Sequence, residues 1–343
     1  MASSVQPLAK SVNTVYSYNI NSVHTQFSGG DRMSKITVIG AGPLGQATIN
    51  ELITQGHDVV VATRHEISIH AAHWQMADIV TNEGVDSLPP CDAIIACHGI
   101  PYSITAWQRM WPAAADNLIT AAQHRGARLV MTGNLYAYAR NQMPMRATDP
   151  LVPSNPLGAV RAEVTRRLFD AHAQGKVEAV EVRGSDYIGA DAPEAYLGKR
   201  FFTPLLAKKK ITVIGAPDVV HTYTAVPDFG RLLARAATDP AMSGRAWHVP
   251  SAPAISTRDL ARRTLNLAGI EHEPRFTSLP PIILKMLGFF SPTMRAVASM
   301  AHQMTDPYIM DDADTRELLG ENHTELDETL RAISDSSWAM AAR

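Results

Sequence analysis

A glycine-rich turn near the start of the chain constrains the fold more than any other feature. Its sequence is Gly40-Ala41-Gly42-Pro43-Leu44-Gly45, between an apolar run at 36–39 and a helical pattern at 46–55. In such a turn the first glycine permits the bend, the second lets the backbone approach a pyrophosphate, and the third lets helix and strand pack closely. The helix that follows offers free N–H groups to phosphate oxygens. Because a strand and a helix flank it, the pattern predicts a dinucleotide site rather than a tight turn without ligand.

The chain after this turn alternates short apolar runs with helical patterns, which indicates strand-helix-strand units and a parallel sheet. Near-continuous apolar runs suit strands covered on both faces. The predicted fold class is α/β, a Rossmann-type doubly wound parallel sheet with a smaller, mostly helical substrate domain. We expect strands at 36–39, 58–62, 77–80, 92–97, 128–132, 177–182 and 211–214, and helices at 46–55, 111–125, 156–173 and 226–237.

The same pattern suggests how the chain divides into domains. Residues 33–190 are expected to form the dinucleotide-binding domain, with a return strand near 244–252. Residues 191–343 are expected to form mainly the substrate-binding and C-terminal helical region. Residues 1–32 are interpreted as a flexible N-terminal extension. A transit peptide is the alternative, although only Lys10 and Arg32 supply positive charge there.

Composition argues against several classes of partner. The formal net charge is −2 and 19% of the residues are charged, so the sequence has no basic footprint for nucleic acid or an anionic membrane. The most hydrophobic stretch, 281–290, is about half as long as a spanning helix. Cys91 and Cys97 are too few for a disulfide framework, and we expect both thiols to be reduced in a cytoplasmic protein. A small-molecule substrate, possibly of apolar character, is therefore the expected partner.

The end of the second expected strand bears on which dinucleotide binds. NAD-preferring sites commonly carry an Asp or Glu there that bonds the ribose 2'-hydroxyl. This chain has Thr63 and Arg64 instead, and a guanidinium suits a 2'-phosphate through charge-assisted hydrogen bonds. We therefore expect NADP(H) as the cofactor. NAD(H) stays open as the alternative because Glu66 lies close by.

Four segments in order along the chain resemble a known family. They are the glycine turn and residues 134–138, 183–189 and 221–228. Together they resemble the atypical extended short-chain dehydrogenases/reductases, often grouped as NAD-dependent epimerase/dehydratase-like proteins. The resemblance runs from about residue 33 to near the C-terminus. It implies a Rossmann fold, a nicotinamide cofactor and a substrate side shaped by the later segments.

The chemistry usual in that family needs three groups, and this chain departs from all of them. A Tyr exchanges a proton with the substrate, a Lys one helical turn later lowers the pKa of that Tyr, and a Ser or Thr bonds the reacting oxygen. The nearest register places Leu157 and Arg161 at the Tyr and Lys positions. By distance from Tyr138, the Ser position falls on Asn134, with Thr132 nearby. Leu157 cannot exchange a proton, so the usual acid/base step does not carry over.

Other residues expected at the carboxyl ends of the strands, where such sheets bind ligands, supply the candidates for catalysis. These candidates are Asn134, Tyr138, Arg161, Tyr187 and His221. Asn134 would polarise a carbonyl, and Arg161 would bind the nicotinamide ribose, although a guanidinium does not titrate. Each tyrosine and the histidine has a competing interpretation as a packing residue with a satisfied hydrogen bond.

Two further clusters have structural interpretations. The imidazoles at 65, 70 and 73 favour a solvated helix face, and we expect no metal site because an ordered helix with another ligand is not indicated. The apolar stretch 280–304 is interpreted in three ways that stay open: the core of the smaller domain, the wall of an apolar substrate pocket, or the contact of a homodimer.

The leading functional hypothesis is an NADP(H)-dependent oxidoreductase acting on a small organic carbonyl, alcohol or activated alkene. In it the protein supplies orientation and a hydrogen bond to the oxygen where charge develops. One alternative is a non-catalytic NADP(H)-binding, redox-sensing regulator, for which the missing Tyr and Lys would be no loss. The other is a dehydratase, epimerase or cyclase on the same fold.

Overall fold

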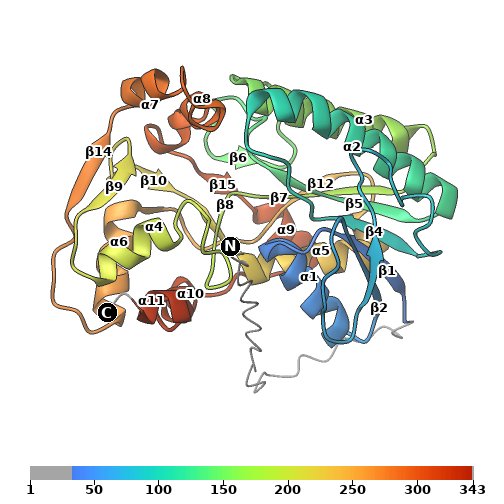
Figure 1. The fold of residues 1–343 in the computed structure, drawn as a ribbon, viewed down its shortest axis with the longest axis horizontal. Helices are drawn as coiled ribbons and strands as arrows, with labels where there is room; N and C mark the ends of the chain where they lie inside the picture. Colours follow the sequence, from blue (N-terminus) through green and yellow to red (C-terminus); the bar gives the residue numbers. More distant parts are fainter. Residues whose placement is uncertain (1–32, 342–343) are drawn as a thin grey trace, which may run out of the picture. The chain divides into compact units, whose positions relative to one another are not determined.

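Seven parallel strands form the central sheet of this computed structural model, which describes residues 33–341 (Figure 1). Expectations about residues 1–32 lie outside the described residues. The strands lie in the order β12-β7-β5-β4-β1-β2-β3. Their bounds are β1 Lys35–Ile39, β2 Asp58–Thr63, β3 His73–Met76, β4 Ala93–Ala96, β5 Arg128–Asn134, β7 Ala179–Gly184 and β12 Ala246–His248.

Helices cover both faces of this sheet, which confirms the predicted Rossmann-type, doubly wound α/β class. Helices α1 (Pro43–Thr54) and α5 (Val226–Thr238) pack against one face. Helices α2 (Ile104–Arg125) and α3 (Pro156–Ala173) pack against the other. The buried strands are mainly apolar, as expected for strands covered on both sides, although β7 carries the buried ion pair of Glu181 and Arg183.

The third strand differs from the one predicted at 77–80. The observed strand β3 lies just before that stretch, at the edge of the sheet. Its position at the edge explains why its sequence, His-Trp-Gln-Met, is not apolar. An edge strand is half exposed and needs no apolar run. The predicted stretch is instead a turn, in which the Asp78 carboxylate accepts the Val80 N–H at 2.8 Å. Ala77 and Ile79 are apolar because they pack into the core beside α2, so the prediction of a strand there was wrong.

A second core lies beside the sheet domain and contains most of the later elements. Its framework is α4 (Lys199–Leu206), α6 (Thr257–Leu267) and α10 (Leu326–Ser334), with the parallel pair β9 (Ile211–Ile214) and β14 (Phe276–Leu279). Shorter elements complete the chain: β6 Met145–Arg146, β10 Val220–His221, β13 Ile255–Ser256, β15 Met310–Asp311, α9 Ala313–Leu319 and α11 Ser337–Met340, with 3-10 turns at Pro240–Met242 and Ala301–Met304.

One short strand pair joins the two parts of the molecule at the point where the sheet ends. Strand β8 (Asp186–Ile188) follows β7 directly and pairs in parallel with β11 (Tyr223–Ala225), so that Asp186 lies opposite Tyr223. This pairing brings the segment after the sixth sheet strand beside the segment around His221. Both segments had been singled out from the sequence.

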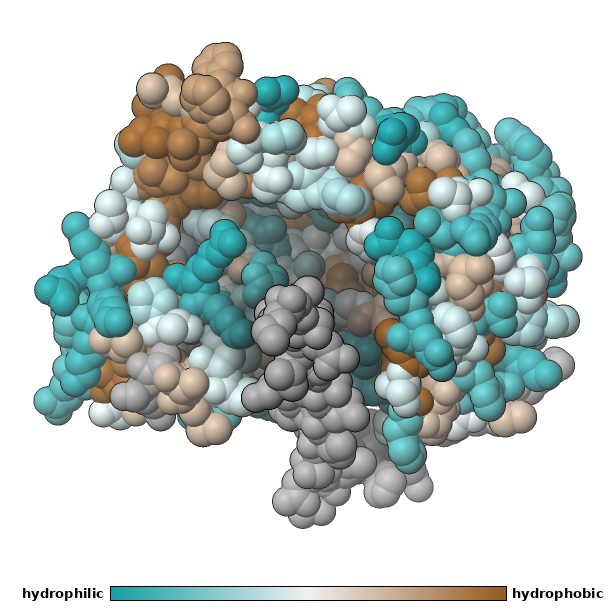
Figure 2. Space-filling view, in the orientation of Figure 1, coloured by the Kyte–Doolittle hydropathy of each residue, from teal (hydrophilic) through white to brown (hydrophobic). Residues whose placement is uncertain are grey.

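The apolar stretch 280–304 divides into two parts with different surroundings. Helix α7 (Pro281–Leu287) and the turn after it carry exposed apolar side chains, visible as a brown patch at the upper left of Figure 2. The exposed members are Ile282, Ile283, Met286, Leu287, Phe289 and Phe290. Helix α8 (Pro292–Ser299) and the turn that follows instead contribute Val297, Met300 and Met304 to the wall of a cavity.

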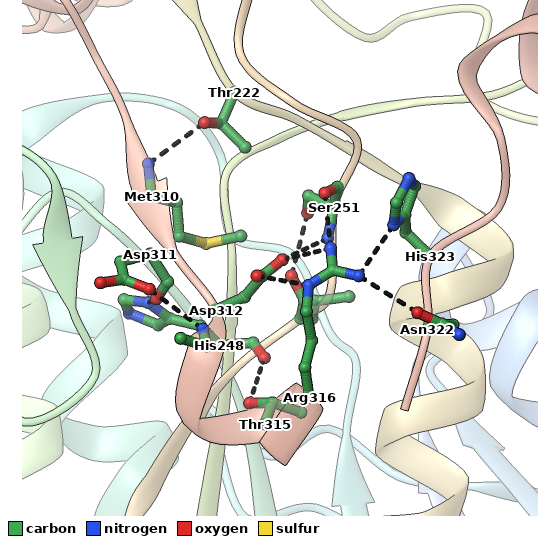
Figure 3. Close-up of polar contacts among 12 residues, drawn as sticks. Thr222, His248, Ser251, Met310, Asp311, Asp312, Thr315, Arg316, Asn322 and His323 are labelled. Atoms are coloured by element: carbon green, nitrogen blue, oxygen red, sulfur yellow. Dashed lines mark hydrogen bonds and ion pairs between the residues drawn. The ribbon is translucent and has the colours of Figure 1, made fainter. Parts of the chain in front are cut away.

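A polar network fastens α9 to the loop after β12 (Figure 3). Arg316 donates from Nε and Nη2 to the two carboxylate oxygens of Asp312, at 2.7 and 2.9 Å. Its Nη2 also donates to the Ser251 carbonyl, and the Ser251 N–H donates to Asp312. The remaining nitrogen, Nη1, faces Asn322 and His323. The guanidinium thus links its own helix to the loop at Ser251 and to the segment at Asn322 and His323. All three of its nitrogens have partners.

Candidate functional site

The glycine turn has the geometry that a bound pyrophosphate needs. Gly40 has φ of 93°, a left-handed conformation that favours glycine. A Cβ on Gly45 would lie 2.2 Å from the Gly40 carbonyl oxygen, so this glycine is required for packing. A Cβ on Gly42 would meet nothing within 4 Å, and no side chain caps the α1 N-terminus that begins at Pro43. Open space therefore lies where a helix N-terminus attracts anions, which fits a dinucleotide.

The end of β2 carries an arginine that is free to bind a ligand, and no acidic side chain is fixed beside it. The Thr63 hydroxyl donates to the His65 carbonyl at 2.6 Å and accepts from Trp74 Nε1 at 2.9 Å, so its hydrogen bonds are satisfied locally. Arg64 is exposed and makes no hydrogen bond or ion pair within residues 33–341. Its guanidinium is thus available to a ligand. Glu66 is exposed as well.

Two adjoining cavities lie beyond the carboxyl ends of the sheet strands, where Figure 2 shows the surface hollowed between the sheet domain and the second core. The smaller, of about 120 Å³, touches the glycine turn through Leu44. The larger, of about 320 Å³, extends toward the second core. Four residues line both cavities: Tyr136, Asp186, Tyr187 and Gln303.

The smaller cavity is walled largely by the ends of β5 and β7. Its lining is Leu44, Thr132, Gly133, Asn134, Leu135, Tyr136, Gly184, Ser185, Asp186, Tyr187, Phe229, Gln303 and Tyr308. Asn134 therefore lies where the sequence placed it, with its Oδ1 accepting the Tyr136 N–H at 3.1 Å. Tyr187 also lies at this position, since it lines both cavities.

The larger cavity has an acidic and aromatic wall. Its charged side chains are Asp186 and Glu194, and no Lys or Arg of the described chain lines it. Apolar contacts come mainly from α8 and the turn after it. Its hydroxyl groups belong to four tyrosines: Tyr102, Tyr136, Tyr187 and Tyr196. Burial raises the pKa of all four, to about 12 for Tyr102 and Tyr196, so each is a protonated hydrogen-bond donor at neutral pH.

Asp186 and His221 form a carboxylate–imidazole pair at the wall. His221 Nε2 lies 3.3 Å from the Asp186 carboxylate and 3.5 Å from the Ser185 hydroxyl. Its Nδ1 lies 3.2 Å from the Gln303 carbonyl, which can only accept, so Nδ1 must carry a hydrogen. Nε2 is then the ring nitrogen that faces both the Asp186 carboxylate and the Ser185 hydroxyl. The imidazole is 2% exposed whereas Asp186 lines both cavities, so the carboxyl is the group that a ligand can reach.

Two buried polar groups at the cavities make no complete hydrogen bond in the described chain, although burial raises the pKa of the second and the first lies near enough to lower it. They are Gln303 Nε2 and the Tyr308 hydroxyl, on side chains only 4% and 3% exposed. An unsatisfied buried donor costs about 1–3 kcal/mol. Gln303 lines both cavities and Tyr308 the smaller one. Their unpaired groups therefore favour a ligand that supplies the missing partners. With Asp186 and His221 they form what we call the cavity cluster.

The residues at the family's Tyr and Lys positions do not line either cavity. Leu157, in the first turn of α3, is fully buried in the core. Arg161 is 3% exposed, donates to the Thr132 carbonyl at 2.5 Å, lies 3.6 Å from Glu181 and stacks over the Trp111 ring. Burial lowers the pKa of its guanidinium. The side chain thus lines neither cavity, and its Nε has no hydrogen-bond partner among the described residues.

Tyr138, another of the catalytic candidates, lines neither cavity. Its hydroxyl accepts from Arg183 Nη1 at 2.6 Å and donates to His248 Nε2 at 2.8 Å. His248 Nδ1 in turn donates to the Asp311 carbonyl at 2.8 Å. Each of the side-chain groups in this series of hydrogen bonds has a partner. Together with Ser251, Asp312 and Arg316 these residues form the closed network.

Several lining residues carried no local signal in the sequence. Gln303 reaches the cavities from a short turn more than a hundred residues after β7, and Glu194 comes from an irregular loop. Asp186 was within a segment already singled out, but its importance depends on the β8–β11 pairing. The Asp186–His221 pair becomes visible only in the folded structure, where the two side chains lie close together.

Residues 33–341 contain neither a candidate metal-binding group nor a candidate membrane-spanning helix. No group of three His, Cys, Asp or Glu side chains lies close enough to hold a metal ion. His65, His70 and His73 are not gathered around a common point of that kind. None of the helices described has the length and apolar character that a membrane crossing needs.

Comparison with known proteins relates the chain to one group. Its fold is similar to that of MoeE5, solved with UDP-glucose and NAD, with a TM-score of 0.72, 18% identity, and coverage of 90% of this chain and 99% of that one. The UDP-glucuronic acid 4-epimerase from Bacillus cereus, solved with NAD, gives a TM-score of 0.71 at 16% identity and covers 90% and 100%. The UDP-glucose 4-epimerase from Thermotoga maritima gives 0.71 at 18% identity and covers 88% and 98%.

At these identities the likeness shows the fold. No curated protein matches the sequence significantly. The family model for the NAD dependent epimerase/dehydratase family, however, matches residues 36–249, which is more than half of the chain and includes the glycine turn, β5, α3 and β12. The chain therefore belongs to the NAD dependent epimerase/dehydratase family.

Proposed function

We propose that this protein is an NADP(H)-dependent oxidoreductase that interconverts a small carbonyl compound and its alcohol. The observation that carries the proposal is the pair of adjoining cavities. One touches the glycine turn, the other contains a distinct set of polar groups, and Asp186, Tyr187 and Gln303 line both. We also propose that residues 33–190 chiefly hold the cofactor and that the later residues chiefly shape the substrate side.

The glycine turn and the α1 N-terminus would hold the pyrophosphate, and Arg64 would pair with a 2'-phosphate. When bound, the nicotinamide supplies or accepts a hydride. Three solved structures of similar fold contain NAD: MoeE5, the enzyme WbmH from Bordetella bronchiseptica and the UDP-glucuronic acid 4-epimerase from Bacillus cereus. The preference for NADP(H) rests on this chain's own Arg64 and on the lack of an acid at the end of β2.

Asp186 would hold and move the proton that the carbonyl oxygen gains or loses. The usual tyrosine position is Leu157, and burial raises the pKa of every tyrosine in the larger cavity, which disfavours a phenolate. A proton bound to the Asp186 carboxyl would have His221 Nε2 within 3.3 Å, close enough for the imidazole to position it. In this arrangement the carboxyl faces the substrate and His221 positions it, while Asn134 and the Gln303 amide donate to the substrate oxygen.

Cofactor binding can be tested without reference to any substrate. We expect NADPH to bind more tightly than NADH in a fluorescence titration, and Arg64→Ser to remove most of that difference. Gly42→Ala should abolish binding of both while leaving the melting temperature unchanged, because the new methyl group meets no protein atom. Gly45→Ala is the contrasting variant, since its methyl group clashes with backbone at 2.2 Å and should lower stability as well. Equal or tighter binding of NADH would contradict the assignment to NADP(H).

The reaction type needs a second experiment. A panel of small ketones and aldehydes is incubated with stoichiometric NADPH, and cofactor oxidation is compared with product formed. An epimerase or dehydratase is the second candidate, favoured by the fold it shares with UDP-sugar 4-epimerases, and it would convert substrate with no net cofactor consumption. Protein that binds NADPH but oxidises it with no compound would instead support a redox-sensing regulator.

A further inference from the structure

We infer that the larger cavity accepts a substrate that carries a positive charge, as a protonated or quaternary amine, together with the reacting oxygen. The inference rests on the proposed function in treating this cavity as the substrate site. It concerns only recognition, so binding tests it independently of turnover.

The charges of the wall favour a cation over an anion. Glu194 is exposed, lines only the larger cavity, and makes no ion pair or hydrogen bond within the described residues. Asp186, the other acidic group of the lining, lies 3.3 Å from the His221 imidazole, whereas Glu194 has no cationic partner in that part of the chain. With no Lys or Arg of the described chain in the lining, a phosphate or carboxylate would meet repulsion without compensation.

The uncharged part of the wall suits the same kind of group. Four tyrosine rings surround the space with Met300 and Met304. Aromatic faces attract ammonium groups, and thioethers adapt to the methyl or methylene groups next to the nitrogen. A cavity of about 320 Å³ is at the lower end of ordinary ligand sites, which favours a compact substrate.

Gln303 supplies an independent indication of the rest of the ligand. Its Nε2 is a buried donor without a partner, and the side chain lines both cavities. A donor placed there favours an acceptor oxygen on the ligand near the junction with the smaller cavity. Glu194 lines only the larger cavity, which places the cationic end away from that junction. An amino ketone or amino alcohol satisfies both ends at once.

A matched pair of ligands isolates the charge. The first is a methyl ketone with a trimethylammonium group one carbon from the carbonyl, and the second is the isosteric methyl ketone with a tert-butyl group in its place. Their dissociation constants are measured by calorimetry on the full chain with saturating NADP⁺ and again without cofactor. We expect the cationic ketone to bind about tenfold more tightly, with an advantage that shrinks as salt rises.

Substitutions at Glu194 test whether the preference for the cationic ketone arises in the larger cavity. Glu194→Gln should remove most of the tenfold advantage, and Glu194→Lys should reverse it, with little change in binding of the neutral ketone. Glu271→Gln is the matched control, because Glu271 is also exposed but lines neither cavity. Equal binding of the two ketones, failure of both to bind, or equal effects of Glu194→Gln and Glu271→Gln would overturn the inference.

The same data distinguish this inference from the proposed function. If NADPH is oxidised by neutral ketones with no preference for the cation, the assignment of the substrate class fails and the oxidoreductase stands. If the cation is preferred but NADPH is never oxidised, the ligand site stands and the oxidoreductase fails. A nucleoside diphosphate sugar that binds more tightly than the cationic ketone would contradict the charge argument directly.

Discussion

The closed network and the cavity cluster are both sets of largely buried polar side chains, but they differ in how completely their groups are paired. In the closed network, Tyr138, His248 and Arg316 each bond to named partners, as Figure 3 shows for the part around Arg316. In the cavity cluster, Gln303 Nε2 and the Tyr308 hydroxyl have none among the described residues. Because burial without a partner costs free energy, we propose from this difference that the first set maintains the fold and the second binds a ligand.

The largest effect expected is on catalysis, from Asp186→Asn. The amide cannot hold or transfer the proton, so kcat should fall by about 10²–10⁴-fold. Tyr138→Phe is the matched variant from the closed network, and it should leave kcat within about twofold while lowering the free energy of unfolding by about 1–2 kcal/mol. Steady-state kinetics and denaturant unfolding of both variants measure these effects. A Tyr138→Phe enzyme with lost turnover and normal stability would break the comparison.

Much of the fold could be predicted because it depends on local patterns. The glycine turn, the apolar runs of β1, β4 and β5, and helix α3 all follow from residues close together in the sequence. β3 could not be predicted, since an edge strand carries no apolar run and the nearby apolar residues serve the core. The exposed patch of α7 and the cavity wall of α8 share one apolar pattern, so periodicity alone could not separate them.

The candidate site was predictable only in part, for a physical reason. Asn134 and Tyr187 follow sheet strands, and the edge of the sheet fixes their position. Tyr138 follows the same strand but its hydroxyl is taken by Arg183 and His248, which depends on how β12 returns to the sheet. The sequence shows that a hydroxyl is present but not whether a partner elsewhere already uses it. Satisfaction of hydrogen bonds is a property of the folded chain.

The next effect is on stability, from Arg316→Met. Methionine keeps much of the side chain's bulk but leaves the Asp312 carboxylate and the Ser251 carbonyl without their strongest donor. The Arg316 side chain is 28% exposed, so water offsets part of the loss, and we expect the free energy of unfolding to fall by about 2 kcal/mol. Urea unfolding measures it. Binding of NADPH should be unchanged, and a selective loss of cofactor affinity would show that this network is not purely structural.

His248 gives the closed network a pH dependence. Burial lowers its pKa to about 3 in the folded chain, whereas an unfolded histidine has about 6.5. Between these values the unfolded chain binds the proton and the folded chain does not, so stability falls as pH drops below about 6.5. The loss should reach about 1.4 kcal/mol at pH 5.5.

This slope can be assigned by substitution. His98, whose pKa burial also lowers to about 3, should add a similar contribution. His248→Gln should lower stability at pH 7.5 but reduce the further loss between pH 7.5 and 5.5, whereas the exposed His65→Gln should leave the loss as it is. Thermal unfolding across this range provides the measurement. An unchanged slope in His248→Gln would mean that this imidazole is protonated when folded.

The smallest effect on stability, and the sharpest test of the comparison, is expected from Gln303→Leu. This substitution removes a buried side-chain donor that has no partner. It retains the backbone carbonyl of residue 303, which accepts the hydrogen bond from His221 Nδ1. Because the unpaired amide costs free energy in the absence of ligand, stability should be unchanged or rise by about 0–1 kcal/mol.

The affinity for substrate should fall at the same time, since the ligand loses the donor reserved for its oxygen. Calorimetry of binding and of unfolding on the same variant separates the two effects. A clear loss of stability would place Gln303 with the closed network, and the distinction between paired and unpaired burial would then no longer identify the site.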